Sequence, residues 1–143
     1  MKKYEILKDD FIQFEEKTLY RIRALRSFRN VRKGDIGGYI EKEDNLSHDG
    51  DAWVYGNAKV YGNAEVYGDA WVYESHHILT ISSIGSRNGI TTFFKTKKGI
   101  SVKCGCFYGT LEEFKDKVEE VHKGTKHFKA YFKAIELAQI QIN

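Results

Sequence analysis

The chain has 143 residues, of which 41% are hydrophobic and 14% aromatic, and its formal net charge is +3. This length fits one domain, or two small domains joined by a repeat. The sequence has no run of eighteen apolar residues and no apolar signal core near Met1, so it predicts neither a membrane span nor secretion. Two cysteines so close together, Cys104 and Cys106, fit free thiols in a reducing compartment, and we expect a cytoplasmic protein.

Residues 1–44 are expected to form an N-terminal β cap. Apolar and polar residues alternate over residues 18–25, and residues 11–14 supply a pairing strand. Seven basic residues and no acidic ones lie between positions 17 and 33. Arg21 and Arg23 share one face of the expected strand, so they are one candidate site for an anion.

Four copies of a six-residue unit follow, over residues 51–74. They read DAWVYG, NAKVYG, NAEVYG and DAWVYE, and a degenerate copy at 45–50 precedes them in phase, with His48 in the valine position. A period of six with an aliphatic residue in a fixed position is typical of a parallel β-helix. We therefore predict a short β-helical solenoid over residues 45–75, with the valines inward, the alanines at tight corners and the glycines at positive φ.

The first and fourth copies repeat the same five residues at a spacing of eighteen, which is one coil if three hexads close a turn. Trp53 should then lie above Trp71, and Tyr55 above Tyr73, on an outer face. Exposed aromatic rows mark contact surfaces, so we expect this row to pack against the rest of the chain or against a sister subunit, and these four residues are the predicted oligomer interface. A ring-stacking ligand site on the same row is the alternative.

Residues 76–143 are expected to form a further domain, a three-stranded meander followed by two helices. Strands are predicted over 77–84, 90–96 and 100–107, with hairpin turns between them. Thr110 and Glu113 have the spacing of a capping box that opens the first helix. The expected inward residues of the two helices are Leu111, Phe114, Val118, Val121, Phe128, Tyr131, Phe132, Ile135 and Ala138. The fold class predicted for the whole chain is mainly β with an α+β tail.

The segment Gly85-Ser86-Arg87-Asn88 is the main candidate site. Turn amides beside an arginine fork can bind a phosphate or carboxylate, so Ser86, Arg87 and Asn88 are predicted to bind an anion. Thr92 and Lys103, on the next strands, are expected to lie nearby. The alternative is an ordinary hairpin with a solvated arginine.

Other chemistry receives little support from the sequence. Cys104 and Cys106 lack the second cysteine pair of a common zinc site, so we expect small core residues, no metal and no cofactor. No local motif supplies a nucleophile with its base, so no catalytic residue is assigned and the sequence favours a non-enzyme. The arginines between positions 21 and 32 are spaced as strand and loop residues, which disfavours nucleic-acid binding.

Several segments carry a resemblance to known proteins. They are Gly37-Gly-Tyr-Ile-Glu41, the Tyr-Gly-Asn-Ala hexads, the Gly85–Asn88 turn, and Cys104-Gly-Cys-Phe107 leading into Gly109-Thr-Leu111. The hexads resemble the left-handed β-helix of hexapeptide-repeat acyltransferases, and most of the chain resembles small phage and prophage proteins of the hexapeptide-repeat, polymer-forming kind. The resemblance implies a left-handed parallel β-helix capped by N-terminal strands, and the host cytoplasm if the protein is phage-encoded. It implies no catalytic residues.

Under two coils of repeat bury too little surface to be stable alone, so we expect a homo-oligomer, most simply a trimer. The expected function is non-catalytic: a phage-type oligomeric binding protein that sequesters a nucleotide-like anion of host defence signalling. Other small phage proteins act as sponges for such nucleotides, which is an analogy of context. The alternatives are a protein-binding inhibitor of a host factor and a hexapeptide-repeat acyltransferase.

Overall fold

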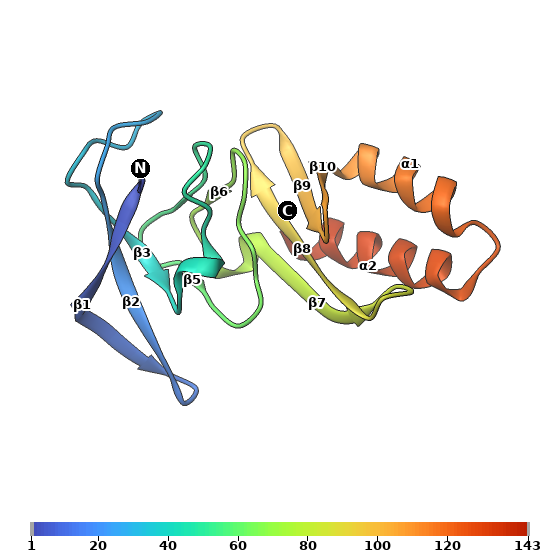
Figure 1. Ribbon diagram of the computed structural model, residues 1–143, viewed down its shortest axis with the longest axis horizontal. Helices are drawn as coiled ribbons and strands as arrows, with labels where there is room; N and C mark the ends of the chain where they lie inside the picture. Colours follow the sequence, from blue (N-terminus) through green and yellow to red (C-terminus); the bar gives the residue numbers. More distant parts are fainter. Residues whose placement is uncertain (1, 143) are drawn as a thin grey trace.

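The computed structural model describes residues 2–142. Figure 1 shows an N-terminal sheet at one end, the repeat in the middle, and a second sheet with two helices at the other end. The elements are β1 (Tyr4–Phe14), β2 (Lys17–Ala24), β3 (Ile36–Ile40), η1 (Glu43–Asn45), β4 (Trp53–Val54), β5 (Lys59–Val60), β6 (Trp71–Val72), η2 (Ser75–His77), β7 (Ile78–Ile84), β8 (Gly89–Thr96), β9 (Gly99–Cys104), β10 (Phe107–Thr110), α1 (Leu111–His122) and α2 (Lys126–Ile142). No helix among the described residues is long and apolar enough to cross a membrane.

The first sheet has the strand order β1-β2-β3-β5, so it joins the N-terminal strands to the repeat. β1 and β2 pair antiparallel with Phe11 opposite Tyr20, which confirms the predicted pairing. Ile22 and Ala24 are buried on one face, because alternate side chains of a strand point the same way. β3 is antiparallel to β2 and parallel to β5.

Three of the four hexads contribute a strand of only two residues. Trp53 pairs in parallel with Trp71, and Val54 with Val72, so the eighteen-residue register is confirmed. The valine and alanine positions are all buried, namely Val54, Val60, Val66, Val72, Ala52, Ala58, Ala64 and Ala70. Gly56, Gly62 and Gly68 close the first three hexads with φ of 56°, 65° and 65°, which confirms the expected glycine corners.

The predicted left-handed parallel β-helix is nevertheless wrong. Within residues 2–142 parallel pairing is confined to β3–β5, β4–β6 and the bridge from Leu46 to Val66, while the other strand pairs are antiparallel. Four hexads make little more than one coil, so the open edges of that single layer must be covered by other strands. β3 covers one side, and Thr96 of β8 bridges to Ala70 on another. The acyltransferase alternative thereby loses the solenoid on which it depended.

The degenerate first copy is displaced by two residues from the predicted phase. Leu46, not His48, bridges in parallel to Val66 and is fully buried. The preceding 3-10 turn sets this shift, because the buried Asn45 accepts hydrogen bonds from the N–H groups of Glu41 and Lys42 at 3.2 and 3.0 Å. An aliphatic side chain therefore fills the interior position, and the imidazole of His48 stays at the surface of the coil.

The second sheet has the order β10-β9-β8-β7 and is antiparallel throughout. It has four strands where three were predicted, because Gly105 and Cys106 form a tight turn between β9 and β10. α1 begins at the predicted capping box: the Thr110 N–H donates to Glu113 Oε1 at 2.8 Å, and the Glu113 N–H donates to Thr110 Oγ1 at 3.1 Å. The two C-terminal helices are confirmed.

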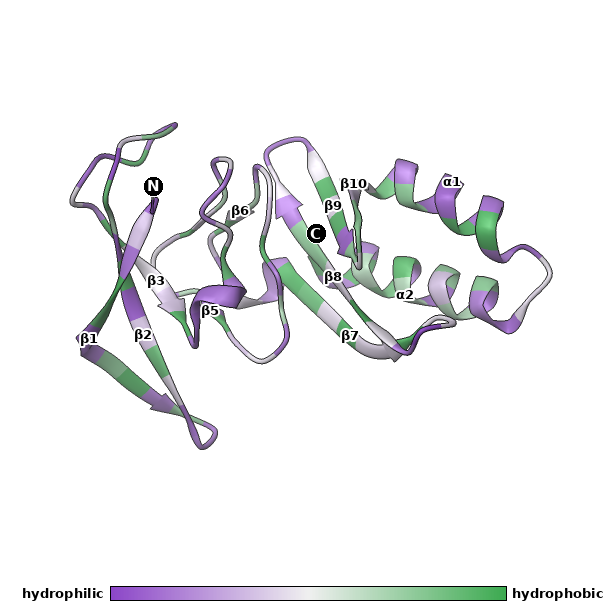
Figure 2. Ribbon diagram, viewed as in Figure 1, coloured by the Kyte–Doolittle hydropathy of each residue, from purple (hydrophilic) through white to green (hydrophobic). Residues whose placement is uncertain are grey.

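Two clusters of buried apolar side chains lie on opposite faces of this sheet. Phe94 belongs to the cluster formed by the N-terminal sheet and the repeat, whereas Phe93 belongs to the cluster under the helices. Neighbouring residues of a strand point to opposite faces, and hydropathy alternates along the strands and helices in Figure 2. Buried side chains of the N-terminal sheet and of the repeat therefore belong to one core. Most residues predicted to face inward on the two helices are buried or half-buried, but Val121 is 55% exposed.

Candidate functional site

A pocket of about 420 Å³ lies between the β7–β8 turn, the β9–β10 turn and the two helices. We call it the helix-side pocket. Its apolar wall consists of Ile84, Ile90, Phe107, Phe114, Val118, Val121 and Tyr131, and its polar wall consists of Ser86, Arg87, Cys104, Cys106, Lys117 and His122. None of its lining residues carries a carboxylate. It brings together two segments that the sequence singled out separately, the Ser86-Arg87 turn and the Cys-Gly-Cys segment.

The β7–β8 turn places Arg87 at the edge of this pocket. Gly85 and Asn88 adopt positive φ values of 84° and 51°, and the Asn88 N–H donates to the Gly85 carbonyl at 3.1 Å. Glycine and asparagine tolerate this conformation better than other residues, which is why the sequence turns here. Arg87 is exposed and makes no hydrogen bond or ion pair with any described residue. Its guanidinium donors are therefore available to a ligand.

The phenol of Tyr131 forms the inner part of the pocket. It approaches the β7–β8 turn so closely that a Cβ atom on Gly85 would lie 2.1 Å from Tyr131 Oη. Burial, followed by the nearby Cys104 group, raises the pKa of Tyr131 to about 12. Tyr131 is therefore a neutral hydroxyl that can donate a hydrogen bond at any physiological pH.

Cys104 lies beside Tyr131, where the polar and apolar walls of the pocket meet. Its Sγ accepts a hydrogen bond from Thr91 Oγ1 at 3.1 Å and lies 3.8 Å from Tyr131 Oη. Cys106 lies in the β9–β10 turn and is exposed, so the expectation that both cysteines are small core residues is wrong for Cys106. A turn, unlike the predicted strand, leaves the second thiol at the surface.

Lys117 and His122 of α1 add positive or ionisable groups to the rim. Lys117 Nζ lies 4.0 Å from a carboxylate oxygen of Glu120, with both side chains more than half exposed, so this pair is weak. The His122 ring lies 5.4 Å from the Tyr131 ring. Lys117 was not predicted in this role, because it lies on the polar side of α1. Its position three residues after Phe114, on the adjoining edge of the inward stripe, was the available signal.

Thr92 and Lys103 do not join Arg87. Thr92 is fully buried, and its Oγ1 accepts from the Glu65 N–H of the repeat at 3.1 Å. Lys103 lies opposite Thr92 and places its ammonium 5.0 Å from the Tyr67 ring centroid, while donating to the Gly105 carbonyl. Both contacts lie on the face of the sheet that covers the repeat. The strand period of two separates Thr92 from Thr91, whose hydroxyl is buried on the other face and donates to Cys104 Sγ.

The competing basic strand is already used by the fold. Arg21 donates to the carbonyl oxygens of Gly37 and Gly56 at 3.1 and 2.7 Å and to Asn57 Oδ1 at 2.8 Å. Arg23 donates to Glu5 Oε2 from both Nε and Nη2, at 2.8 and 2.6 Å. Arg21 thereby fastens the N-terminal sheet to the repeat, and neither arginine is free for an external anion.

The predicted aromatic interface is partly covered by the same chain. Trp53 is 1% exposed and packs edge-on against Tyr4 and Phe28. Tyr55 and Tyr73 do stack, with ring centroids 4.1 Å apart and an interplanar angle of 11°. The cationic groups of Arg29 and Lys97 lie 5.6 and 5.7 Å from the centroid of Trp71.

Tyr73, at 40% exposure, is the most accessible member of this row, and Trp53 is not accessible to a partner. The register of the row was predictable from the eighteen-residue repeat. Which residues cover the row was not predictable, because they come from the non-repeating N-terminal segment and, for Lys97, from the β8–β9 turn.

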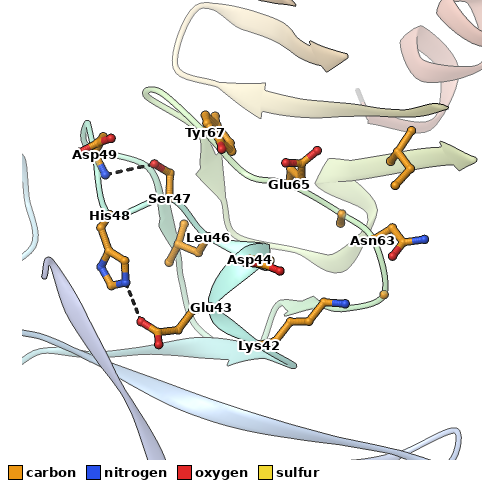
Figure 3. Close-up of a pocket in the computed structure, with 13 residues that line it drawn as sticks. Lys42, Glu43, Asp44, Leu46, Ser47, His48, Asp49, Asn63, Glu65 and Tyr67 are labelled. Atoms are coloured by element: carbon orange, nitrogen blue, oxygen red, sulfur yellow. Dashed lines mark hydrogen bonds and ion pairs between the residues drawn. The ribbon is translucent and has the colours of Figure 1, made fainter. Parts of the chain in front are cut away.

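A second cavity, of about 510 Å³, lies on the repeat side of the molecule (Figure 3). Its lining contains four carboxylates, those of Glu43, Asp44, Asp49 and Glu65. His48 Nε2 lies 2.8 Å from Glu43 Oε1, and this hydrogen bond is the main cause that lowers the pKa of Glu43.

The other ring nitrogen of His48 accepts from the Lys3 N–H at 3.1 Å. Both ring nitrogens of His48 therefore hold the N-terminus against η1. None of the predicted ligand residues lies in this cavity. Within residues 2–142 no group of three or more His, Cys, Asp or Glu side chains is arranged to hold a metal ion.

Comparisons with known proteins assign no function to this site. No protein-family model matches the chain, and no curated protein matches its sequence.

Proposed function

We propose that the protein is a binding protein that holds a small amphipathic anion in the helix-side pocket. The observation that carries this proposal is the composition of the pocket, which combines an apolar wall with Arg87 and Lys117 and contains no carboxylate. Small-molecule sites are typically apolar cavities of about 300–1,000 Å³ with a few polar groups that orient the ligand. The pocket, at about 420 Å³, falls within that range.

The positions of these groups suggest the shape of the ligand. Phe107 and Phe114, whose ring centroids lie 5.4 Å apart, favour contact with a flat apolar or aromatic moiety. Arg87, at the rim, favours a carboxylate or phosphate, because its planar guanidinium can donate two parallel hydrogen bonds to either group. Nucleotide-like anions combine both features, so they are the first class to test, in the cytoplasmic setting that the sequence suggests.

Arg87→Ala is the variant that tests this proposal. Fluorescence titration with 8-anilinonaphthalene-1-sulfonate, an aromatic anion, should show binding to the wild type that adenosine monophosphate reduces and neutral adenosine does not. Loss of a hydrogen-bonded charge pair costs about 1.5–3 kcal/mol, so Arg87→Ala should weaken binding roughly ten- to a hundredfold. Folding should be unaffected, since an exposed arginine without a partner contributes little to stability.

Arg32→Ala is the matched control, because Arg32 is exposed in the N-terminal segment and its side chain has no hydrogen bond or ion pair with a described residue. This variant should bind the dye as the wild type does. Arg87→Lys should lie between the wild type and Arg87→Ala, since lysine keeps the charge but not the fork. Equal affinity of wild type and Arg87→Ala would refute the proposed site.

A further inference from the structure

The β9–β10 turn presents two thiols to one cavity. Cys104 is the last residue of β9, Gly105 and Cys106 form the turn, and both cysteines are free and line the helix-side pocket. Consecutive Cα atoms are about 3.8 Å apart, so the Cα atoms of two residues with one residue between them lie roughly 5–7 Å apart. A disulfide needs about 4.4–6.8 Å between Cα atoms, and a tight turn favours the short end of the range. The chain geometry thus admits a Cys104–Cys106 disulfide.

The two thiols differ in accessibility. Cys106 is exposed, whereas Cys104 is half-buried and accepts the hydrogen bond from Thr91 Oγ1. An exposed thiol can reach a disulfide that enters from solvent, and a recessed neighbour can then displace the leaving group. Gly105, at φ +58°, has nothing within 4 Å of its ideal Cβ position, so the turn has room to adjust.

The charged groups that line the pocket are cationic. They are Arg87 and Lys117, whereas Lys103 places its ammonium against Tyr67 on the other face of the sheet. No carboxylate lines the pocket to offset these cations. Clefts lined by one sign of charge raise the local concentration of the opposite ion and accelerate its association.

We propose that Cys104 and Cys106 form a thiol–disulfide exchange site for anionic low-molecular-weight disulfides. The Cys106 thiol loses its proton, and the thiolate attacks one sulfur of the incoming disulfide; the S–S bond of the reagent breaks, a mixed disulfide forms, and the first small thiolate leaves and takes up a proton. The Cys104 thiol then loses its proton, and the thiolate attacks Cys106 Sγ, breaks the mixed disulfide and releases the second small thiolate, which takes up the second proton. The protein dithiol is oxidised to the Cys104–Cys106 disulfide, and the external disulfide is reduced to two thiols. The preference for anions rests on the proposed function of this pocket, whereas the exchange chemistry rests on the two cysteines alone.

Intact mass spectrometry of the full chain tests both parts separately. Pre-reduced protein is mixed with glutathione disulfide, hydroxyethyl disulfide or cystamine, which are anionic, neutral and cationic, and is quenched with N-ethylmaleimide. Each rate is divided by the rate of the same reagent with N-acetylcysteine amide, which corrects for the leaving group. We expect a product lighter by two hydrogens and unable to react with maleimide. Its corrected rate should be at least about tenfold higher with glutathione disulfide than with cystamine.

The variants assign the roles of the two cysteines and of the rim. Cys104→Ser should accumulate a stable mixed disulfide on Cys106, and Cys106→Ser should react more slowly than the wild type. Arg87→Glu should lower the ratio of the corrected rate with glutathione disulfide to the corrected rate with hydroxyethyl disulfide. Lys98→Glu, in the exposed β8–β9 turn, is the charge-matched control and should change neither rate.

Two results would overturn the inference, and they are distinguishable. A wild-type protein that stops at the mixed disulfide with all three reagents would refute the dithiol site. This result would not contradict the proposed anion site, which the dye-binding experiment tests. Formation of the internal disulfide at equal corrected rates with all three reagents would refute the selection of anionic disulfides and count against the anion site itself.

Discussion

In the half of the molecule built from the N-terminal sheet and the repeat, several charged side chains are held by other segments of the chain. Arg21 donates three hydrogen bonds to other segments, and Lys3 is fully buried with its ammonium donating to the Ala52 carbonyl. In the half built from the second sheet and the helices, Arg87 makes no such contact with the described residues and stands at the edge of an apolar pocket. Arg21 and Lys3 therefore help to hold the first half together, whereas Arg87 in the second half is available to a ligand.

The two halves meet at β8, and neighbouring residues of that strand serve different purposes. Thr92 accepts a hydrogen bond from the repeat, whereas Thr91 donates to Cys104 on the pocket side. A one-residue difference in position thus decides whether a buried threonine bonds to the repeat or to Cys104 of the pocket. The following predictions test how firmly the first half is closed and how precisely the second is shaped.

The largest loss of folding stability is expected on substitution of Trp53. Trp53→Ala should destabilise the protein by about 3–5 kcal/mol, because it removes a fully buried indole packed between Tyr4 and Phe28. Trp71→Ala, the equivalent position eighteen residues later, should cost distinctly less because Trp71 is only partly buried. Urea denaturation of both variants gives the comparison. Equal losses would show that the N-terminal segment does not cover Trp53 as described.

Gly85→Ala tests the close approach of Tyr131 in the second half. Gly85 and Gly124 share a φ of +84°, but only Gly85 has the Tyr131 hydroxyl in the space that a Cβ would occupy. Alanine at Gly124 should cost about 1–2 kcal/mol for the left-handed backbone alone. Alanine at Gly85 should cost about 1–3 kcal/mol more for the overlap.

Thermal or urea unfolding measures both glycine variants. Adding Tyr131→Phe to Gly85→Ala should recover part of the extra loss, since it removes the overlapping oxygen. If the two alanine variants lose the same stability, the phenol does not press on the turn.

The smallest effect is a dependence of the free energy of unfolding on pH that originates at Lys3. Burial, followed by repulsion from Arg26, lowers the pKa of Lys3 from 10.5 to about 7, while Asp51 and Asp49 act in the opposite direction and Arg29 in the same one. Between pH 7 and 10.5 the unfolded chain then binds more protons at Lys3 than the folded chain, so the free energy of unfolding should rise with pH in this window. One such group contributes at most about 1.4 kcal/mol per pH unit.

The slope should be measured between pH 7.5 and 9.5 by urea denaturation. Above about pH 10 the raised pKa values of Tyr4 and Tyr131 act in the opposite sense, because the unfolded chain loses those phenolic protons first. Lys3→Met should flatten the slope, and Lys2→Met, at an exposed neighbour, should leave it unchanged. If the slope persists in Lys3→Met, the pH dependence originates at another group.

The sequence by itself determined the local structure of this protein. The six-residue period fixed which valines and alanines are buried, the eighteen-residue spacing fixed the Trp53–Trp71 register, and the Thr110–Glu113 pair fixed the start of α1. These features depend on side-chain size, backbone φ and hydrogen bonds between near neighbours, which a sequence pattern records directly.

Only the tertiary structure decided how these pieces are covered and which charges remain free. Nothing in the hexads indicates that β3 and Thr96 occupy their edges in place of further coils, or that residues 4 and 28 cover Trp53. The same holds for Arg21 and Arg87, which are equally basic in the sequence. Arg21 donates to the carbonyl oxygen of Gly56, thirty-five residues away, whereas Arg87 lies at the edge of a pocket. Long-range packing sets the partners of each side chain, and local sequence does not.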